Sequence, residues 1–257
     1  MTFKEWIYSD YTNNPSIDGR WGILHILTLI LCVGIIVGIA FFGKNNKKRS
    51  KIILITLSSV ILFFELSRRI INLTKGDIDG IRDLLATLLP RPWCAISCWM
   101  LILCPIVNKK FWYNFTAISA LLNAIIFFAY PGVGFNHKYI MFENLYSITT
   151  HALLLITSIS LMTLKFTDYK YSKDSYKDFI LYFCILACAF IEIFILKIEA
   201  DPLYFMNGND VQDVFGFSYP VYLIVYVVFT IVWFNIPYLI QTYLSPKIKK
   251  YLKNQTN

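Results

Sequence analysis

The sequence feature that most constrains the fold of this chain is a series of long apolar stretches. A helix that crosses a bilayer needs about 20 mostly apolar residues, because each residue adds only about 1.5 Å of rise. Seven stretches have that length: 21–43, 52–72, 86–107, 112–130, 144–164, 178–197 and 217–243. The loops between them are short. The sequence therefore predicts an all-α fold, a polytopic membrane helical bundle of about seven transmembrane helices that forms a single domain over residues 1–257.

The composition excludes a water-soluble domain. Charged residues make up 16% of the 257 residues and apolar residues 57%, whereas a soluble domain carries about 25% charged residues. All six cysteines fall within apolar stretches, which argues against the disulfide framework of a small secreted domain. The first stretch is too long for the apolar core of a signal peptide, so we expect it to stay as an anchor.

Lysine and arginine residues are divided unevenly between the two sides of the predicted bundle. Cytoplasmic loops carry the excess of these residues in membrane proteins. Here the excess follows the first, third, fifth and seventh stretches: Lys44, Lys47, Lys48, Arg49, Lys51, Lys109, Lys110, Lys165, Lys170, Lys173, Lys177, Lys247, Lys249, Lys250 and Lys253. This predicts an outside N-terminus and a cytoplasmic C-terminus for a multi-pass protein of the cell membrane. The net charge of +8 then needs no nucleic acid as a partner, since basic loops are attracted to anionic lipid headgroups.

Ionisable side chains within membrane spans are costly, so each is a candidate functional group. With the predicted orientation, the polar residues of the spans fall in the outer half of the membrane: His25, Glu65, Arg68, Arg69, Cys94, His151, Glu192 and Lys197. The inner half has almost no charge. This segregation predicts one polar cavity, the active cavity, that opens toward the outer face.

Structural roles for the same residues are the alternative. Glu65 and Arg69 are four residues apart, so they can neutralise each other on one helix. Arg68 and Lys197 can extend their charged ends to the interface. His25 can serve as a hydrogen-bond donor between packed helices.

Cys94 differs from the other cysteines because of the residues before it. Pro90 and Pro92 prevent an ordinary helix interior, since proline removes a backbone donor and pushes the preceding residue out of helical geometry. Pro92 suits the first helical position, which places Cys94 in the first turn of a helix. Free amide groups there, together with Arg91, favour the thiolate that acts as a nucleophile. The same amides can serve as an oxyanion hole.

The other five cysteines have no such setting, so we interpret them as small buried apolar residues. They are Cys32, Cys98, Cys104, Cys184 and Cys188. A metal site built from Cys94, Cys98 and the two histidines of the spans is the alternative, but the spacing of a structural zinc site is absent, and no metal is predicted.

Four segments of the chain resemble the bacterial YwaF-like family, whose animal relative is transmembrane protein 164. They are Trp21–His25, Leu88–Cys94, Phe142–Tyr146 leading to His151, and Leu203–Met206 together with Tyr219–Tyr222. The resemblance implies a membrane-embedded acyltransferase in which a cysteine takes a fatty acyl group from a phospholipid and a histidine on a later helix assists. Carried over to this chain, the cysteine is Cys94 and the histidine is His151. A second histidine that bacterial relatives carry beside the nucleophile is absent here.

The predicted function is therefore acyl transfer from a membrane phospholipid through a thioester on Cys94, with His151 as general base and then general acid. Covalent catalysis of this kind requires no cofactor. Arg91, with Arg68 or Arg69, is expected to hold the lipid phosphate, and His25 to orient an acyl carbonyl or His151. The acceptor is left open between a lysophospholipid, a lipoprotein amine and water, and so is the oligomeric state.

Two other classes of function stay open at this point. A carrier for a small solute or ion would use Glu65, Arg68, Arg69 and Glu192 as its working groups, and it would tolerate loss of the Cys94 thiol. An enzyme needs Cys94 and His151 but tolerates the loss of an individual charge. A purely structural or assembly role is the third class.

Overall fold

The computed structural model describes residues 6–7, 21–75, 78, 80–91, 93–129, 132–135, 137–171, 175–195, 212 and 215–244. These residues form helices joined by short connections, which confirms the predicted all-α fold. The α-helices are α2 (Ile23–Gly43), α3 (Lys47–Thr74), α4 (Ile81–Leu88), α5 (Trp93–Val107), α6 (Lys110–Ala129), α7 (Gly132–Phe135), α8 (Phe142–Thr163), α9 (Tyr176–Phe190) and α11 (Tyr219–Leu239). Two π-helical segments, η2 (Ile191–Ile195) and η3 (Ile240–Leu244), directly continue α9 and α11.

The number of membrane crossings is smaller than the seven apolar stretches suggest. Five described helices are long and apolar enough to cross a membrane: α2, α3, α6, α8, and α11 together with η3. A sixth crossing results if α4 and α5 form one span bent by 58°. The stretch predicted over 178–197 contains α9, whose α-helical part has only 15 residues. The protein is a multi-pass helical bundle, and a seventh crossing and the orientation of the termini remain predictions.

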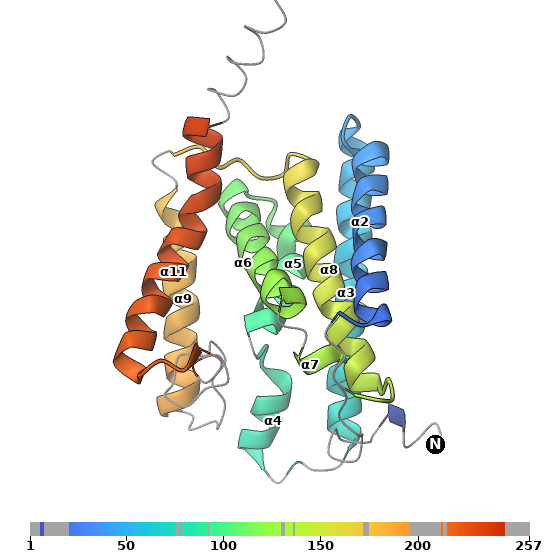
Figure 1. Cartoon of the computed structure of the whole chain (residues 1–257), viewed down its shortest axis with the longest axis vertical. Helices are drawn as coiled ribbons and strands as arrows, with labels where there is room; N and C mark the ends of the chain where they lie inside the picture. The colour runs from blue at the N-terminus through green and yellow to red at the C-terminus, as the bar shows by residue number, and fades with distance from the viewer. Residues whose placement is uncertain are drawn as a thin grey trace, which may run out of the picture.

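The helices are arranged around α6 and α8 (Figure 1). In that view α2 and α3 stand on one side of this pair, and α9 and α11 stand on the other. Within the most apolar part of α6, 67% of the residues are buried, compared with 11% in α2. The outer helices therefore turn apolar side chains outward, away from the core. A water-soluble protein rarely exposes so large an apolar surface, whereas a bilayer solvates it.

Successive long helices run in opposite directions, so alternate loops meet at the same end of the bundle. The connections after α2, α5 and α8 lie at the upper end in Figure 1. We call this the basic end, because it carries Lys44, Lys47, Lys109, Lys110 and Lys165. The opposite end carries α4 and α7, which lie lower in the same view. The loop lysines that follow α2, α5 and α8 therefore share one end, and the assignment of that end to the cytoplasm remains a prediction.

The predicted interruption of the third stretch is confirmed. Helix α4 ends at Leu88, α5 begins at Trp93, and Leu89 has an extended backbone with a ψ of 144°. Leu89 precedes Pro90, whose ring excludes the helical conformation for the residue before it. The regular helix thus begins at Trp93 rather than at residue 86, and Cys94 is its second residue. Pro92 lies outside the described residues.

A second proline within the bundle is compensated by a neighbouring helix. Pro105 lies inside α5, where it has no N–H to donate to the carbonyl four residues earlier. That carbonyl belongs to Leu101, and the buried hydroxyl of Ser58 on α3 donates to it at 2.9 Å. The Leu101 carbonyl, which the proline leaves unpaired within α5, therefore accepts a hydrogen bond that joins α3 to α5.

Candidate functional site

Cys94 lies half-buried in the first turn of α5, facing charged groups of α3. Its thiol interacts electrostatically with Arg68 and Glu65, and it reaches the backbone amide of Ala95. The first-turn amides of a helix have no intrahelical acceptor and carry a partial positive charge. The guanidinium and these amides both attract an anion, which is the setting of a reactive cysteine.

Glu65 is the centre of a buried network that joins α3 to α8. Its side chain is 1% exposed, and its two carboxylate oxygens have separate partners. Arg69 donates from Nη1 to Oε2 at 2.5 Å, and the Tyr146 hydroxyl donates to Oε1 at 2.5 Å. The Cys98 thiol also hydrogen-bonds the carboxylate. The expected i, i+4 neutralisation of Arg69 by Glu65 is confirmed, and Tyr146 is a partner that sequence reasoning missed.

Arg68 belongs to the same group, which we call the Glu65 network (Glu65, Arg68, Arg69 and Tyr146). Its guanidinium carbon lies 5.0 Å from the centre of the Tyr146 ring, a cation–π arrangement. The guanidinium also interacts with Cys94 and Glu65. Arg68 therefore faces the candidate nucleophile.

Three arginines line one small cavity beside this network. It has a volume of about 170 Å³ and is lined by Arg68, Arg69, Asn72, Ala86, Thr87, Leu89 and Arg91. We call it the arginine pocket. Arg91 donates from Nη2 to the Ala86 carbonyl at 2.9 Å, but its Nε and Nη1 are buried without a partner. The structure therefore brings together the three arginines that the sequence assigned to substrate binding.

Glu192 approaches Arg91 from the far side of the break between α4 and α5. It is the second residue of η2 and interacts electrostatically with Arg91. One of its carboxylate oxygens, Oε2, is buried without a partner. Lys197, the other polar residue expected at this depth, lies outside the described residues.

His151 has the hydrogen bonding of a neutral base. Its ring stacks on Phe127 with centroids 3.9 Å apart, and Nδ1 lies 2.8 Å from the Ser147 carbonyl. A carbonyl only accepts, so Nδ1 carries the proton and Nε2 keeps a free lone pair. Within the described part of the chain, no hydrogen bond joins His151 to Cys94, so their pairing remains a prediction.

His25 is completely buried, and its hydrogen-bond contact is with the backbone of Phe128. It is surrounded by aromatic rings: Trp21 at 5.0 Å, Phe135 at 4.8 Å and Phe128 at 5.9 Å between centroids. Phe127, which stacks on His151, contacts the Phe128 and Phe135 rings in turn. His25 and His151 therefore lie on one cluster of aromatic rings. A backbone hydrogen bond to Phe128 on α6 fits the donor role between helices that was considered for His25.

A chain of hydrogen bonds fixes the first turn of α5 against α6. Trp93 donates from Nε1 to the Ser119 hydroxyl at 2.7 Å, and the Ser97 and Ser119 hydroxyls are 2.8 Å apart. Asn123 donates from Nδ2 to Ser97 at 3.0 Å. These residues hold the turn that contains Cys94. Serines in apolar helices carry no specific signal in a single sequence, so sequence reasoning missed them.

A second buried polar network lies toward the basic end, between α6, α9 and α11. Asn114 donates from Nδ2 to the Asp168 carbonyl at 2.8 Å and to the Tyr238 hydroxyl at 3.1 Å. Tyr238 in turn donates to Asp178 at a short distance. Gln241 donates from Nε2 to the Asp168 carboxylate at 2.8 Å. We call these five residues the Asn114 network.

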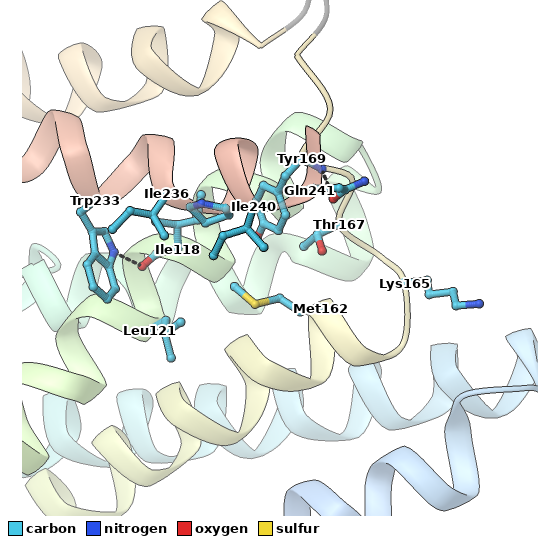
Figure 2. A pocket seen from close by; sticks show the side chains of 11 residues that line it. Ile118, Leu121, Met162, Lys165, Thr167, Tyr169, Trp233, Ile236, Ile240 and Gln241 are labelled. Atoms are coloured by element: carbon cyan, nitrogen blue, oxygen red, sulfur yellow. Dashed lines mark hydrogen bonds between the residues drawn. The ribbon is translucent and has the colours of Figure 1, made fainter. Parts of the chain in front are cut away.

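A second cavity, larger than the arginine pocket, lies away from the candidate site. It has a volume of about 500 Å³ and lies between α6, the end of α8 and α11. Figure 2 shows Leu121, Met162, Trp233 and Ile236 along its apolar part, with Lys165 at one edge. None of the residues predicted to bind or transform substrate lines it. Of the residues predicted to act on substrate, the three arginines line the smaller cavity, and Cys94 lies beside one of them, Arg68.

The cysteines are all free thiols. Cys32, Cys98 and Cys104 are buried, as expected, but Cys184 and Cys188 are exposed on α9. The expectation that these two are buried was wrong, because an apolar helix facing lipid looks the same in sequence as one facing the core. Among the described residues, no group of three or more histidine, cysteine, aspartate or glutamate side chains converges as metal ligands.

A model of the TMEM164 family matches residues 19–238 of this sequence. The chain belongs to the TMEM164 family. The match confirms the resemblance seen in the short motifs, and it spans the helices that carry Cys94, His151, His25 and the three arginines. Neither a curated protein nor a solved structure matches the chain.

Membership of the TMEM164 family and the apolar helices together identify a multi-pass membrane protein. The motif segments at Trp21–His25, Phe142–Tyr146 and Tyr219–Tyr222 begin three of its long helices or lie directly before them. The fourth, Leu203–Met206, lies outside the described residues. The family match covers both the membrane helices and the candidate site, and it specifies no reaction.

Proposed function

We propose that this TMEM164-family protein is an acyltransferase that moves a fatty acyl group from a membrane glycerophospholipid through a thioester on Cys94. The observation that carries this proposal is the position of Cys94. It is the second residue of a helix that starts at a break, beside the Arg68 guanidinium and within reach of first-turn amides, which have no intrahelical acceptor. A nucleophile next to ready-made anion donors is what acyl transfer requires.

The first half-reaction uses His151 as a general base. Its Nε2 takes the proton of the Cys94 thiol, and the sulfur attacks the carbonyl carbon of an ester-linked chain. The free amides of α5 stabilise the oxyanion. The bond from that carbon to the glycerol oxygen breaks, His151 returns the proton to this oxygen, and a lysophospholipid leaves. The proton on Nδ1, held by the Ser147 carbonyl, is what leaves Nε2 available.

The second half-reaction regenerates the thiol. A hydroxyl or amine of the acceptor attacks the thioester while His151 takes its proton, and the departing sulfur then recovers that proton. A lysophospholipid, a lipoprotein amine and water all satisfy this chemistry. In this step Nε2 must come within about 3–4 Å of the sulfur, a contact that often tightens only when substrate is bound. His25 orients the acyl carbonyl or supports His151 through the Phe127 and Phe128 rings.

The membrane placement of this reaction follows from the basic end. With that end in the cytoplasm of a cell-membrane protein, Cys94, the Glu65 network and the arginine pocket lie toward the outer leaflet. The phospholipid donor then enters laterally from that leaflet. Arginines supply the positive charge at the site. Because their guanidinium groups match phosphate geometry, a lipid with a phosphate in its headgroup is favoured as the donor.

Mass spectrometry of the purified protein tests the proposal. We expect a fatty acyl group on Cys94 that hydroxylamine removes, because a thioester is cleaved by that reagent. Cys94→Ala should abolish the adduct, and His151→Ala should slow its formation by about 10²–10⁴-fold, the usual contribution of general base catalysis. Cys98→Ala is the matched control and should form the adduct nearly as fast, because Cys98 lies one turn deeper and is fully buried.

An adduct that persists in Cys94→Ala, or that is lost equally in Cys98→Ala, would contradict the assignment of the nucleophile. A carrier is the second candidate function, and the charged cavity is the observation that favours it. A carrier would move an anion into vesicles with Cys94→Ala as well as with the wild type. Transport that survives this variant, with no adduct in the wild type, would replace the enzyme by the carrier.

A further inference from the structure

The three arginines of the arginine pocket differ in how many of their donors are already used. Arg69 donates from Nε to the Leu88 carbonyl at 3.1 Å and from Nη1 to Glu65, and its guanidinium carbon lies 5.0 Å from the Trp99 ring. Arg69 therefore uses its donors within the protein and forms part of the wall of the pocket. Arg91 is not, because only its Nη2 has a partner while Nε and Nη1 are buried and unpaired.

The break between α4 and α5 explains this arrangement. The last carbonyls of a helix have no intrahelical partner, and the carbonyls of Ala86 and Leu88 at the end of α4 accept from Arg91 and Arg69. The two guanidiniums are thereby held at the same break. The remaining donors of Arg91 are not paired with these carbonyls, which leaves them available to a ligand.

The charges around the pocket do not cancel. Arg68, Arg69 and Arg91 carry three positive charges, whereas Glu65 and Glu192 are the two carboxylates that interact with them. With both carboxylates ionised, these described groups leave one positive charge. Arg68 and Arg91 also repel each other. A single uncompensated charge at membrane depth is costly, and a phosphodiester supplies the one negative charge that balances it.

The size and lining of the pocket fit the same ligand. About 170 Å³ corresponds to roughly five water molecules at about 30 Å³ each, enough for a phosphate group. Asn72 adds a neutral donor to its lining, and no carboxylate lines it within the part of the chain that the structure describes. The planar fork of arginine matches phosphate oxygens in pairs.

We propose that the arginine pocket is a phosphate subsite, in which Arg91 and Arg68 bind the phosphodiester of a glycerophospholipid and Arg69 braces the wall. The subsite rests on the proposed acyl transfer, for which it selects a phosphate-bearing lipid as the acyl donor. Arg68 interacts with Cys94 as well as lining the pocket, so a phosphate held there places the ester linkages of the same lipid near the thiol. Neutral glycerolipids lack the group that the pocket binds and are poor donors.

Lipid binding to the full chain in nanodiscs tests this subsite independently of catalysis. The measurement uses Cys94→Ala as the background and native mass spectrometry as the readout, with phosphatidylglycerol and diacylglycerol of the same acyl chains as probes. We expect retention of phosphatidylglycerol and at least tenfold weaker binding after Arg91→Ala, because charge-assisted hydrogen bonds are lost. Arg91→Lys should recover part of the binding. Arg82→Ala, which removes an exposed arginine of α4 outside the pocket, should change nothing.

Several results would overturn the subsite. One is equal retention of phosphatidylglycerol in Arg91→Ala and in the Cys94→Ala background. A second is diacylglycerol bound as tightly as phosphatidylglycerol. A third is a melting temperature that inorganic phosphate raises through Arg91 while no phospholipid is retained, because the pocket would then serve a soluble anion. Phospholipid binding through Arg91 without any acyl adduct in the wild type would keep the subsite and reject the acyl transfer.

Discussion

The two buried polar networks of this bundle are similar in size but differ in what lies beside them. The Asn114 network, toward the basic end, joins α6 and α11 to the connection after α8 and to α9, and its amides are paired with neighbours in the chain. Asp178 Oδ1 is its one unpaired buried side-chain atom among the described residues. The Glu65 network borders the arginine pocket, where Arg91 keeps two unpaired donors.

This difference separates a structural role from a functional one. Polar groups in a membrane are costly unless they are paired, so the Asn114 network, which we call the closed network, holds helices together. The Glu65 network together with Arg91, which we call the open network, keeps two unpaired donors that a ligand can complete. The larger cavity lies near the closed network and is mostly apolar, whereas the smaller cavity is lined by three arginines at the break in the helix.

Topology mapping gives the largest effect, because its outcome is all or none. Reporter fusions after Lys51, Lys177 and Lys253 should report the cytoplasm, and fusions within 73–85 and 198–216 should report the outside, since basic loops stay in the cytoplasm. Paired reporters active on opposite sides of the membrane make the measurement. An outside signal after Lys51 would place the open network in the inner leaflet and reverse the comparison.

Removing the central carboxylate of the open network should cost the most stability. Glu65→Gln leaves Arg69 as a buried charge without its partner, and we expect a loss of about 3–5 kcal/mol in the free energy of unfolding. Thermal unfolding in detergent measures it. The double variant Glu65→Gln with Arg69→Gln is the control and should recover part of the loss. A single variant as stable as the wild type would show that Arg69 does not depend on Glu65.

Tyr238→Phe tests the closed network with a smaller change. The hydroxyl links Asp178 to Asn114, so its removal should destabilise the protein by about 1–3 kcal/mol, the cost of leaving buried partners unsatisfied. The rate of adduct formation on Cys94, measured by mass spectrometry below the melting temperature, should not change. A slower adduct in a fully stable variant would give the closed network a part in the reaction.

His25→Phe should have the smallest effect on stability. The buried ring has a hydrogen-bond contact with the Phe128 backbone and is otherwise packed on aromatic rings, so a ring of similar shape without nitrogens should lower the free energy of unfolding by at most about 1 kcal/mol. Adduct formation should slow by about tenfold if His25 serves the acyl carbonyl or His151, since active sites often trade stability for function. An unchanged rate would leave His25 as a packing residue only.

The sequence predicts this fold well where local chemistry decides it. Apolar length predicts the helices, Pro90 predicts the extended Leu89, and a spacing of four residues predicts the contact between Glu65 and Arg69. Interhelical partners are different, because neither Tyr146 nor Ala86 has any local feature that points to its contact. The exposed Cys184 and Cys188 have the same cause, since lipid tails are as apolar as a protein core and leave no trace in composition.

The candidate site follows the same division. The sequence could assign Cys94 to a first turn and gather the three arginines by depth, because both depend on position along a helix. It could not rank the arginines, since that ranking depends on which carbonyls and carboxylates lie within reach in space. The tautomer of His151 likewise depends on the Ser147 carbonyl, and the aromatic surroundings of His25 on the packing of α6 and α7.

Pro105 and Ser58 make two distant positions dependent on each other during evolution. The serine is useful because the proline leaves the Leu101 carbonyl free. In an ancestor or relative with a residue other than proline at position 105, the backbone N–H of that residue would donate to the Leu101 carbonyl within α5. Position 58 could then become alanine without leaving this carbonyl unpaired. We therefore expect the two positions to covary, with serine or threonine at 58 accompanying proline at 105. An alignment of related sequences would then record the contact between α3 and α5.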